Sequence, residues 1–149
     1  MVKLLIVYHS YRGNTEAMAK AVCEGASSAG ATVTLKKAAD ATANDLFDCD
    51  VVAFGSPNYY SYMAGVLKDY FDRIYYDVRG KVNDKPYGAF SSGGGSSKLA
   101  LDSIDRLASL SSLRMRKAFE GIVAAGKPSQ DALEECIELG RKLAQLQIS

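Results

Sequence analysis

Short apolar runs alternate along this chain with longer stretches in which apolar and polar positions follow a helical period. The runs span residues 4–8, 32–35, 51–54, 87–90 and 122–125. Runs of this length are typical of strands that are buried on both faces of a sheet. The pattern therefore predicts five buried strands.

The stretches between the runs place apolar residues three and four positions apart, as an amphipathic helix requires. The first begins near Thr15 and is expected to end near Gly30, because glycine tolerates a left-handed helix cap. Further helices are predicted over residues 43–47, 66–75, 99–110 and 132–146. Since every parallel pairing needs a crossover connection, this order predicts an α/β fold. We expect three layers, doubly wound, with a five-stranded parallel sheet and helices on both faces.

Doubly wound folds bind ligands in the crevice beyond the carboxyl ends of their strands. The segment after the first predicted strand contains Ser10, Tyr11, Arg12, Gly13, Asn14 and Thr15. Hydroxyl groups, a glycine and the free N–H groups of a helix N-terminus form a receptor for a phosphate group. Plain helix capping by Ser10, Asn14 or Thr15 explains the same residues. Composition alone leaves the two interpretations equally open.

The loop expected after the third strand is rich in aromatic residues. Six of the nine tyrosines lie in it or soon after it. Its residues include Ser56, Pro57, Asn58, Tyr59 and Tyr60. Aromatic side chains at a ligand crevice suit a flat conjugated ligand, whereas Tyr70 and Tyr75 are expected to pack within a helix.

A segment of serine and glycine follows the fourth predicted strand. It begins with Ser91, Ser92, Gly93, Gly94 and Gly95. Such backbone can approach the edge of a planar ring closely and offer it N–H groups. A flexible linker is the alternative, although a segment directly at a strand end is more often functional.

Other common site chemistries lack their residues in this sequence. Lys98 is followed by Leu99, so the glycine run is no P-loop, and no G-x-G-x-x-G follows the first strand. No G-x-S-x-G occurs, and the single histidine, His9, has no nucleophile paired with it. The acidic residues of a phosphoacceptor domain are also missing after the first and third strands.

Net charge and cysteine content further narrow the possible functional classes of the protein. The 18 basic and 17 acidic residues give a net charge of +1, which argues against binding to nucleic acid or to a membrane. Cys23, Cys49 and Cys136 have no C-x-x-C spacing, so we expect no metal site. We expect a single cytoplasmic domain over residues 1–149, because the apolar N-terminus is too short for a membrane span.

With the three loops together, the chain resembles the flavodoxin family from Met1 to about Leu146. The segment from Ser10 to Thr15 matches the family's S/T-x-T-G-x-T phosphate signature, and the other two loops match in kind. The resemblance implies a short-chain flavodoxin-like fold with strand order 2-1-3-4-5. It also implies non-covalent FMN and electron transfer by the flavin.

By position, the resemblance implies contact residues in all three loops. The phosphate would be held in the loop of Ser10, Tyr11, Arg12, Gly13, Asn14 and Thr15. The isoalloxazine ring would be bordered, with one tyrosine stacked on it, by Ser56, Pro57, Asn58, Tyr59 and Tyr60. Its pyrimidine edge would meet backbone groups of Ser91, Ser92, Gly93, Gly94 and Gly95. No side chain would act as acid, base or nucleophile.

Three departures from the family pattern carry expectations of their own. Arg12 replaces a threonine, and we expect its guanidinium to pair with the phosphate. No glycine lies between Asn58 and Met63, so Asn58, which tolerates positive φ, is expected to supply the peptide that turns toward the reduced flavin. The third loop has no aromatic residue, which would leave one face of the ring open.

The first functional hypothesis is an electron carrier between redox partner proteins, a reductase and an acceptor. The alternative is an FMN-dependent NAD(P)H:quinone or flavin reductase, and a weaker one is a flavin-less binding module. The carrier comes first because the short chain has no evident nicotinamide site. Since the near-zero net charge cannot steer it onto partners, we expect acids to gather near the flavin at Asp69, Asp72 and Asp77.

Overall fold

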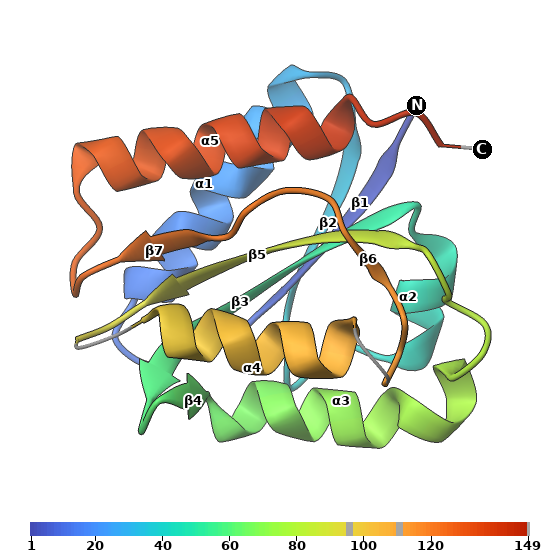
Figure 1. The fold of residues 1–149 in the computed structure, drawn as a ribbon. Helices are drawn as coiled ribbons and strands as arrows, with labels where there is room; N and C mark the ends of the chain where they lie inside the picture. The colour runs from blue at the N-terminus through green and yellow to red at the C-terminus, as the bar shows by residue number, and fades with distance from the viewer. Residues whose placement is uncertain (95–96, 110–111, 149) are drawn as a thin grey trace.

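The computed structural model describes residues 1–94, 97–109 and 112–148, and it has three layers, with a sheet between two layers of helices (Figure 1). The strands are β1 (Lys3–Tyr8), β2 (Thr32–Lys37), β3 (Val51–Tyr59), β4 (Tyr62–Met63), β5 (Pro86–Ser92), β6 (Arg116–Lys117) and β7 (Ile122–Ala124). The helices are α1 (Asn14–Ser28), α2 (Ala43–Asp48), α3 (Gly65–Val78), α4 (Lys98–Ala108) and α5 (Gln130–Ala144). α1 and α5 cover one face of the sheet, and the other three helices cover the opposite face.

The strand order is β2-β1-β3-β5-β6, and every pairing along this path is parallel. β7 also pairs with β5 in parallel, so β6 and β7 together occupy the place of one fifth strand. This confirms the α/β class and the order 2-1-3-4-5. The run at residues 122–125 predicted β7 alone, because both residues of β6 are charged and exposed.

Side chains alternate along the central strands and divide the core into two halves. In β1, Leu4 and Ile6 face α1 and α5, whereas Leu5 and Val7 face the helices on the other side. The expectation that all five strands are buried on both faces is wrong for β2. Within the described residues β2 pairs only with β1, and as an edge strand it leaves Leu35 36% exposed.

β3 continues past the predicted end at residue 54, which changes the nature of the tyrosine-rich segment. The strand runs to Tyr59, turns through Tyr60 and Ser61, and returns as β4, with Tyr59 opposite Tyr62. The φ angles of the two turn residues are 53° and 64°, as a two-residue hairpin turn of type I′ requires. The segment predicted as a loop is therefore a hairpin, because its polar residues pair with β5 and β4.

α1 and α5 approach each other at backbone contact distance. A Cβ atom at Gly25 would lie 1.9 Å from the carbonyl oxygen of Ile137, and one at Gly140 would lie 2.0 Å from that of Val22. Glycine at these two positions therefore lets the helices cross this closely. α1 ends at Ser28, two residues before Gly30, as predicted.

Two further findings concern possible membrane and metal binding. None of the helices in the described ranges is both long and apolar enough to span a bilayer. Cys23, Cys49 and Cys136 are free thiols. Across residues 1–94, 97–109 and 112–148, no three His, Cys, Asp or Glu side chains gather in a way that could hold a metal ion.

Candidate functional site

A pocket of about 370 Å³ lies where β1, β3, β5 and β7 end, at the carboxyl edge of the sheet. It brings together most of the predicted contact residues, namely Ser10, Tyr11, Arg12, Asn14, Thr15, Pro57, Asn58, Tyr59, Ser92, Gly93 and Gly94. Gly126 also lines it, and sequence reasoning missed this residue. Its place directly after the fifth predicted strand was the sequence feature that could have identified it.

The first loop leaves the N-terminus of α1 open. Gly13 is the N-cap residue, with φ 94°, and no side chain in the described part of the chain caps the helix. The Ser10 hydroxyl instead accepts a hydrogen bond from the N–H of Gly13 at 3.0 Å. Capping by Ser10, Asn14 or Thr15 is therefore wrong, and the first N–H groups of α1 have no intrahelical partner.

A buried pair of hydroxyls joins the first loop to the end of β5. The Thr15 and Ser92 oxygens are 2.7 Å apart, and both side chains are almost fully buried. Because this bond spans 77 positions in the chain, it fixes the loop after β1 against the loop after β5. The two loops that sequence analysis assigned to phosphate and ring thus form one wall.

Asn58 connects the hairpin to the segment after β5. The side-chain amide nitrogen of Asn58, Nδ2, donates a hydrogen bond to the carbonyl oxygen of Gly94 at 3.2 Å. The amide oxygen, Oδ1, is left as an acceptor. This Oδ1 is buried and has no hydrogen-bond partner among the described residues. Asn58 lies in β3, and the positive φ angles of the hairpin belong to Tyr60 and Ser61. That Asn58 supplies the peptide that turns toward a reduced flavin stays a prediction.

Gly93 is held in a conformation that other residues rarely adopt. Its φ is 124°, and a Cβ atom there would lie 3.1 Å from the backbone nitrogen of Asn58. Neighbouring Gly94 has neither a positive φ nor an atom within 4 Å of such a Cβ. Gly93 is therefore the glycine of this segment that the pocket requires.

Four predicted contact residues, Gly13, Ser56, Tyr60 and Ser91, lie off the pocket lining. Ser56 is buried, where its hydroxyl donates to the carbonyl oxygen of Pro57 at 2.7 Å and accepts from the N–H of Ala64 at 2.8 Å. Ser91 is buried as well, and Tyr60 is fully exposed at the hairpin tip. Gly95 lies outside the described residues. Ligand contact by these residues stays a prediction.

Arg12 is the one charged side chain among the described lining residues of the pocket. It is exposed and forms no ion pair with any residue in the described ranges. Glu16, in the first turn of α1, already accepts from the Tyr8 hydroxyl at 3.0 Å and lies 3.8 Å from Lys20. Burial lowers the pKa of His9, which precedes the loop, so it stays neutral at pH 7. Arg12 therefore supplies the one side-chain charge among the described lining residues.

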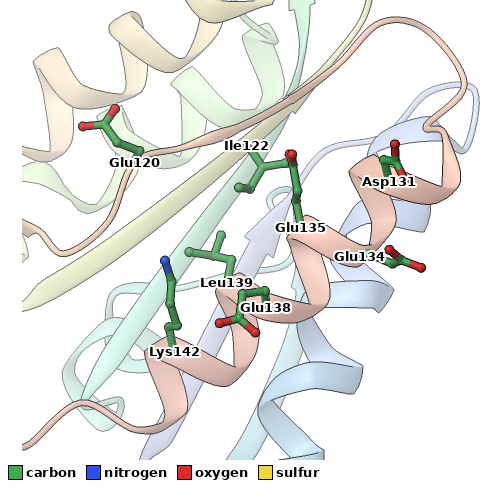
Figure 2. Close-up of a pocket in the computed structure, with 8 residues that line it drawn as sticks. All are labelled: Glu120, Ile122, Asp131, Glu134, Glu135, Glu138, Leu139 and Lys142. Atoms are coloured by element: carbon green, nitrogen blue, oxygen red, sulfur yellow. The ribbon is translucent and has the colours of Figure 1, made fainter.

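A second, larger hollow of about 470 Å³ lies between β7 and α5 (Figure 2). Its lining residues are Glu120, Ile122, Asp131, Glu134, Glu135, Glu138, Leu139 and Lys142. Five carboxylates would repel a phosphate, so the charge of this groove is unsuited to an anionic ligand.

Two of the three acids expected near the flavin are compensated on their own helix. Asp69 pairs with Arg73 at 2.8 Å, and Asp72 pairs with Lys68 at 2.7 Å, as the i,i+4 spacing on α3 allows. The third, Asp77, has no ion-pair partner among the described residues. Asp131 and Glu135, which line the groove in Figure 2, have none within the described residues either, so unpaired carboxylates lie on α5 as well as on α3.

Comparison with known proteins agrees with this architecture. The family model described as Flavodoxin matches residues 6–140. A flavodoxin of Aquifex aeolicus is 35% identical over 160 aligned positions, covering 97% of this chain and 86% of its own. An NAD(P)H dehydrogenase (quinone) of Archaeoglobus fulgidus is 27% identical over 186 positions, covering 98% and 97%.

A solved structure extends the likeness to three dimensions. A flavodoxin from the domain Archaea superimposes with a TM-score of 0.82 at 27% identity, covering 96% of each chain. Several bacterial quinone dehydrogenases match over only 44% to 57% of their own length. The family match spans most of the chain, and together with the strand order and the pocket at the strand ends it shows that this protein belongs to the flavodoxin family.

Proposed function

We propose that this chain binds FMN non-covalently in the pocket at the strand ends and carries electrons between redox partner proteins. The observation that carries the proposal is the pocket itself, in which a helix N-terminus without a side-chain cap and a free cation lie beside an apolar and glycine-lined slot. When bound, FMN would supply the redox chemistry by taking up and releasing one or two electrons.

The residues of the first loop fit a phosphate group. Gly13 turns the chain so that α1 begins with unpaired N–H groups, and the helix dipole favours an anion there. Thr15 and Arg12 line the same end of the pocket. These groups would hold the phosphate without any metal ion.

The other walls fit a flat ring with polar edges. Pro57 and Tyr59 line one side, and Gly93 and Gly94 offer backbone that no side chain shields. The buried Asn58 Oδ1, which lacks a donor among the described residues, lies at this wall. The described lining has no paired acid, base or nucleophile, which leaves the electron transfer to the flavin.

Titration with FMN tests the proposal. The purified protein should be yellow or should bind added FMN. Thr15→Leu should weaken FMN binding roughly tenfold or more, because the bulkier side chain fills the phosphate end of the pocket and breaks the buried hydroxyl pair with Ser92, and overpacking costs about 1–3 kcal/mol. Thr34→Leu, on the exposed face of β2, is the matched control. Unchanged affinity in a folded Thr15→Leu variant contradicts the phosphate assignment, and a colourless protein that FMN does not titrate favours a flavin-less binding module.

An FMN-dependent NAD(P)H:quinone or flavin reductase is the second candidate. Similarity to the Archaeoglobus fulgidus quinone dehydrogenase over nearly the whole chain supports it. NAD(P)H oxidation by the FMN-loaded protein alone, with a quinone as acceptor, separates the two functions. Turnover favours the reductase, whereas reduction that requires a separate reductase protein favours the carrier.

We place the protein in the reducing cytoplasm. Burial raises the pKa of Cys49 to about 11 and that of Cys136 to about 12, so both thiols stay protonated and unreactive at neutral pH. Three free cysteines without a disulfide suit a compartment that keeps thiols reduced.

A further inference from the structure

The phosphate end of the pocket has few side-chain donors to spare. The Ser10 hydroxyl is engaged with the N–H of Gly13 at 3.0 Å, and the Thr15 hydroxyl is engaged with Ser92 at 2.7 Å. Arg12, between them, has no hydrogen bond or ion pair within the described residues. Tyr11 and Asn14 also line the pocket with polar side chains, but Arg12 is the one charged donor among the described lining residues.

Arg12 lies in sequence directly before the N-terminus of α1. It immediately precedes Gly13, whose φ of 94° turns the chain into α1. The side chain is exposed, so it keeps the freedom to close over a group seated on the first turn of the helix. A guanidinium presents a planar fork of donors that matches two phosphate oxygens at once.

The surrounding charges do not compete for this cation. Glu16, in the first turn of α1, already accepts from Tyr8 and lies near Lys20, and it does not line the pocket. No other described residue that lines the pocket carries a charge. A dianion in the pocket would therefore meet one cation and the helix dipole, with no carboxylate facing it.

We propose that Arg12 closes on the phosphate of the bound flavin and makes the pocket selective for the phosphorylated cofactor over riboflavin. This inference rests on the proposed FMN function. It assigns to one guanidinium the charge-dependent part of the affinity, while the ring contacts are left to the walls around Asn58 and Gly93.

Titrations of the full-length apoprotein with FMN and with riboflavin, followed by flavin fluorescence, test the assignment. Arg12→Thr should weaken FMN binding about 10- to 100-fold, the range expected for losing a hydrogen bond to a charged group, and should leave riboflavin binding unchanged. Arg12→Lys should fall between the two, because it keeps the charge but loses the fork. Added salt should weaken FMN binding less in Arg12→Thr than in the wild type.

Lys127→Thr is the matched control. Lys127 is exposed and follows Gly126, but it does not line the pocket, so its loss changes the net charge equally without removing the phosphate contact. An equal effect of Lys127→Thr, or an unchanged ratio of the FMN and riboflavin dissociation constants in Arg12→Thr, overturns the role of Arg12 while FMN binding stands. A wild-type chain that binds neither flavin overturns the proposed function itself.

Discussion

Replacing Gly93 by alanine probes the wall on which the three strand-end segments meet. The new Cβ atom would lie 3.1 Å from the backbone nitrogen of Asn58 and 3.4 Å from its Cβ, and the backbone would have to keep a φ of 124°. A sparsely populated backbone conformation costs roughly 1–3 kcal/mol. The close contact adds to this cost, so we expect unfolding free energy to fall by about 2–3 kcal/mol.

The same change should also displace the part of the pocket wall that would face the flavin ring. Asn58 must shift to admit the methyl group, which moves its hydrogen bond to the Gly94 carbonyl. FMN and riboflavin share the ring, so both should bind more weakly by a similar factor. This distinguishes Gly93→Ala from a change at Arg12, which should act on FMN alone.

Urea denaturation of the apoprotein, followed by circular dichroism, measures the stability, and fluorescence titration measures the affinities. For stability, Gly94→Ala is the matched control, because a Cβ atom there meets nothing within 4 Å; the affinities are compared with those of the wild type. If Gly93→Ala unfolds at the same urea concentration as Gly94→Ala and binds both flavins as tightly as the wild type, the reasoning about this wall is refuted.

Two further predictions concern the fold. Gly25→Ala should lower the unfolding free energy by about 1–3 kcal/mol, since its Cβ atom would overlap the Ile137 carbonyl. Gly65→Ala, which has open space around it, should not lower the unfolding free energy. Equal denaturation midpoints for the two variants would contradict the backbone contact between α1 and α5. Burial opposes ionisation of Asp45, but hydrogen bonds from Lys36 and Thr42 outweigh it and lower the pKa of this carboxyl. The contribution of ionised Asp45 to folding stability is therefore complete above the ordinary carboxyl pKa and is lost as the pH falls through the lowered value. Asp45→Asn should lower the unfolding free energy by about 1 kcal/mol at pH 7. In denaturation experiments at decreasing pH this difference should disappear, and a difference that persists in acid would contradict the role of the ionised carboxylate.

Sequence patterns predicted the parts of the fold that depend on local chemistry. Apolar runs in β1, β3 and β5 and helical periods between them led directly to a parallel, doubly wound sheet, because buried parallel strands must be apolar on both faces. Polar runs gave no such signal. β6 consists of Arg116 and Lys117, and the far half of β3 is held by partners that lie elsewhere in the chain.

The residues of the candidate pocket likewise fall into those that local sequence could predict and those that depend on the tertiary structure. The loop from Ser10 to Thr15 could be placed at the start of α1 from its own residues, because Gly13 and the first helical residues are neighbours in sequence, although its composition left phosphate binding and helix capping equally open. The contribution of Gly126 and the separation of Tyr59 from Tyr60 could not be predicted in this way, since they depend on where β7 ends and how the hairpin turns.

By itself, the sequence determined the layered fold and the place of the pocket at the strand ends, since each follows from spacing within short segments. The tertiary structure decided how those segments meet. It paired Thr15 with Ser92 across 77 positions, packed Gly93 against Asn58 and left Arg12 without a partner in the described chain. Contacts between distant residues depend on the packing of the whole sheet, which no local pattern encodes.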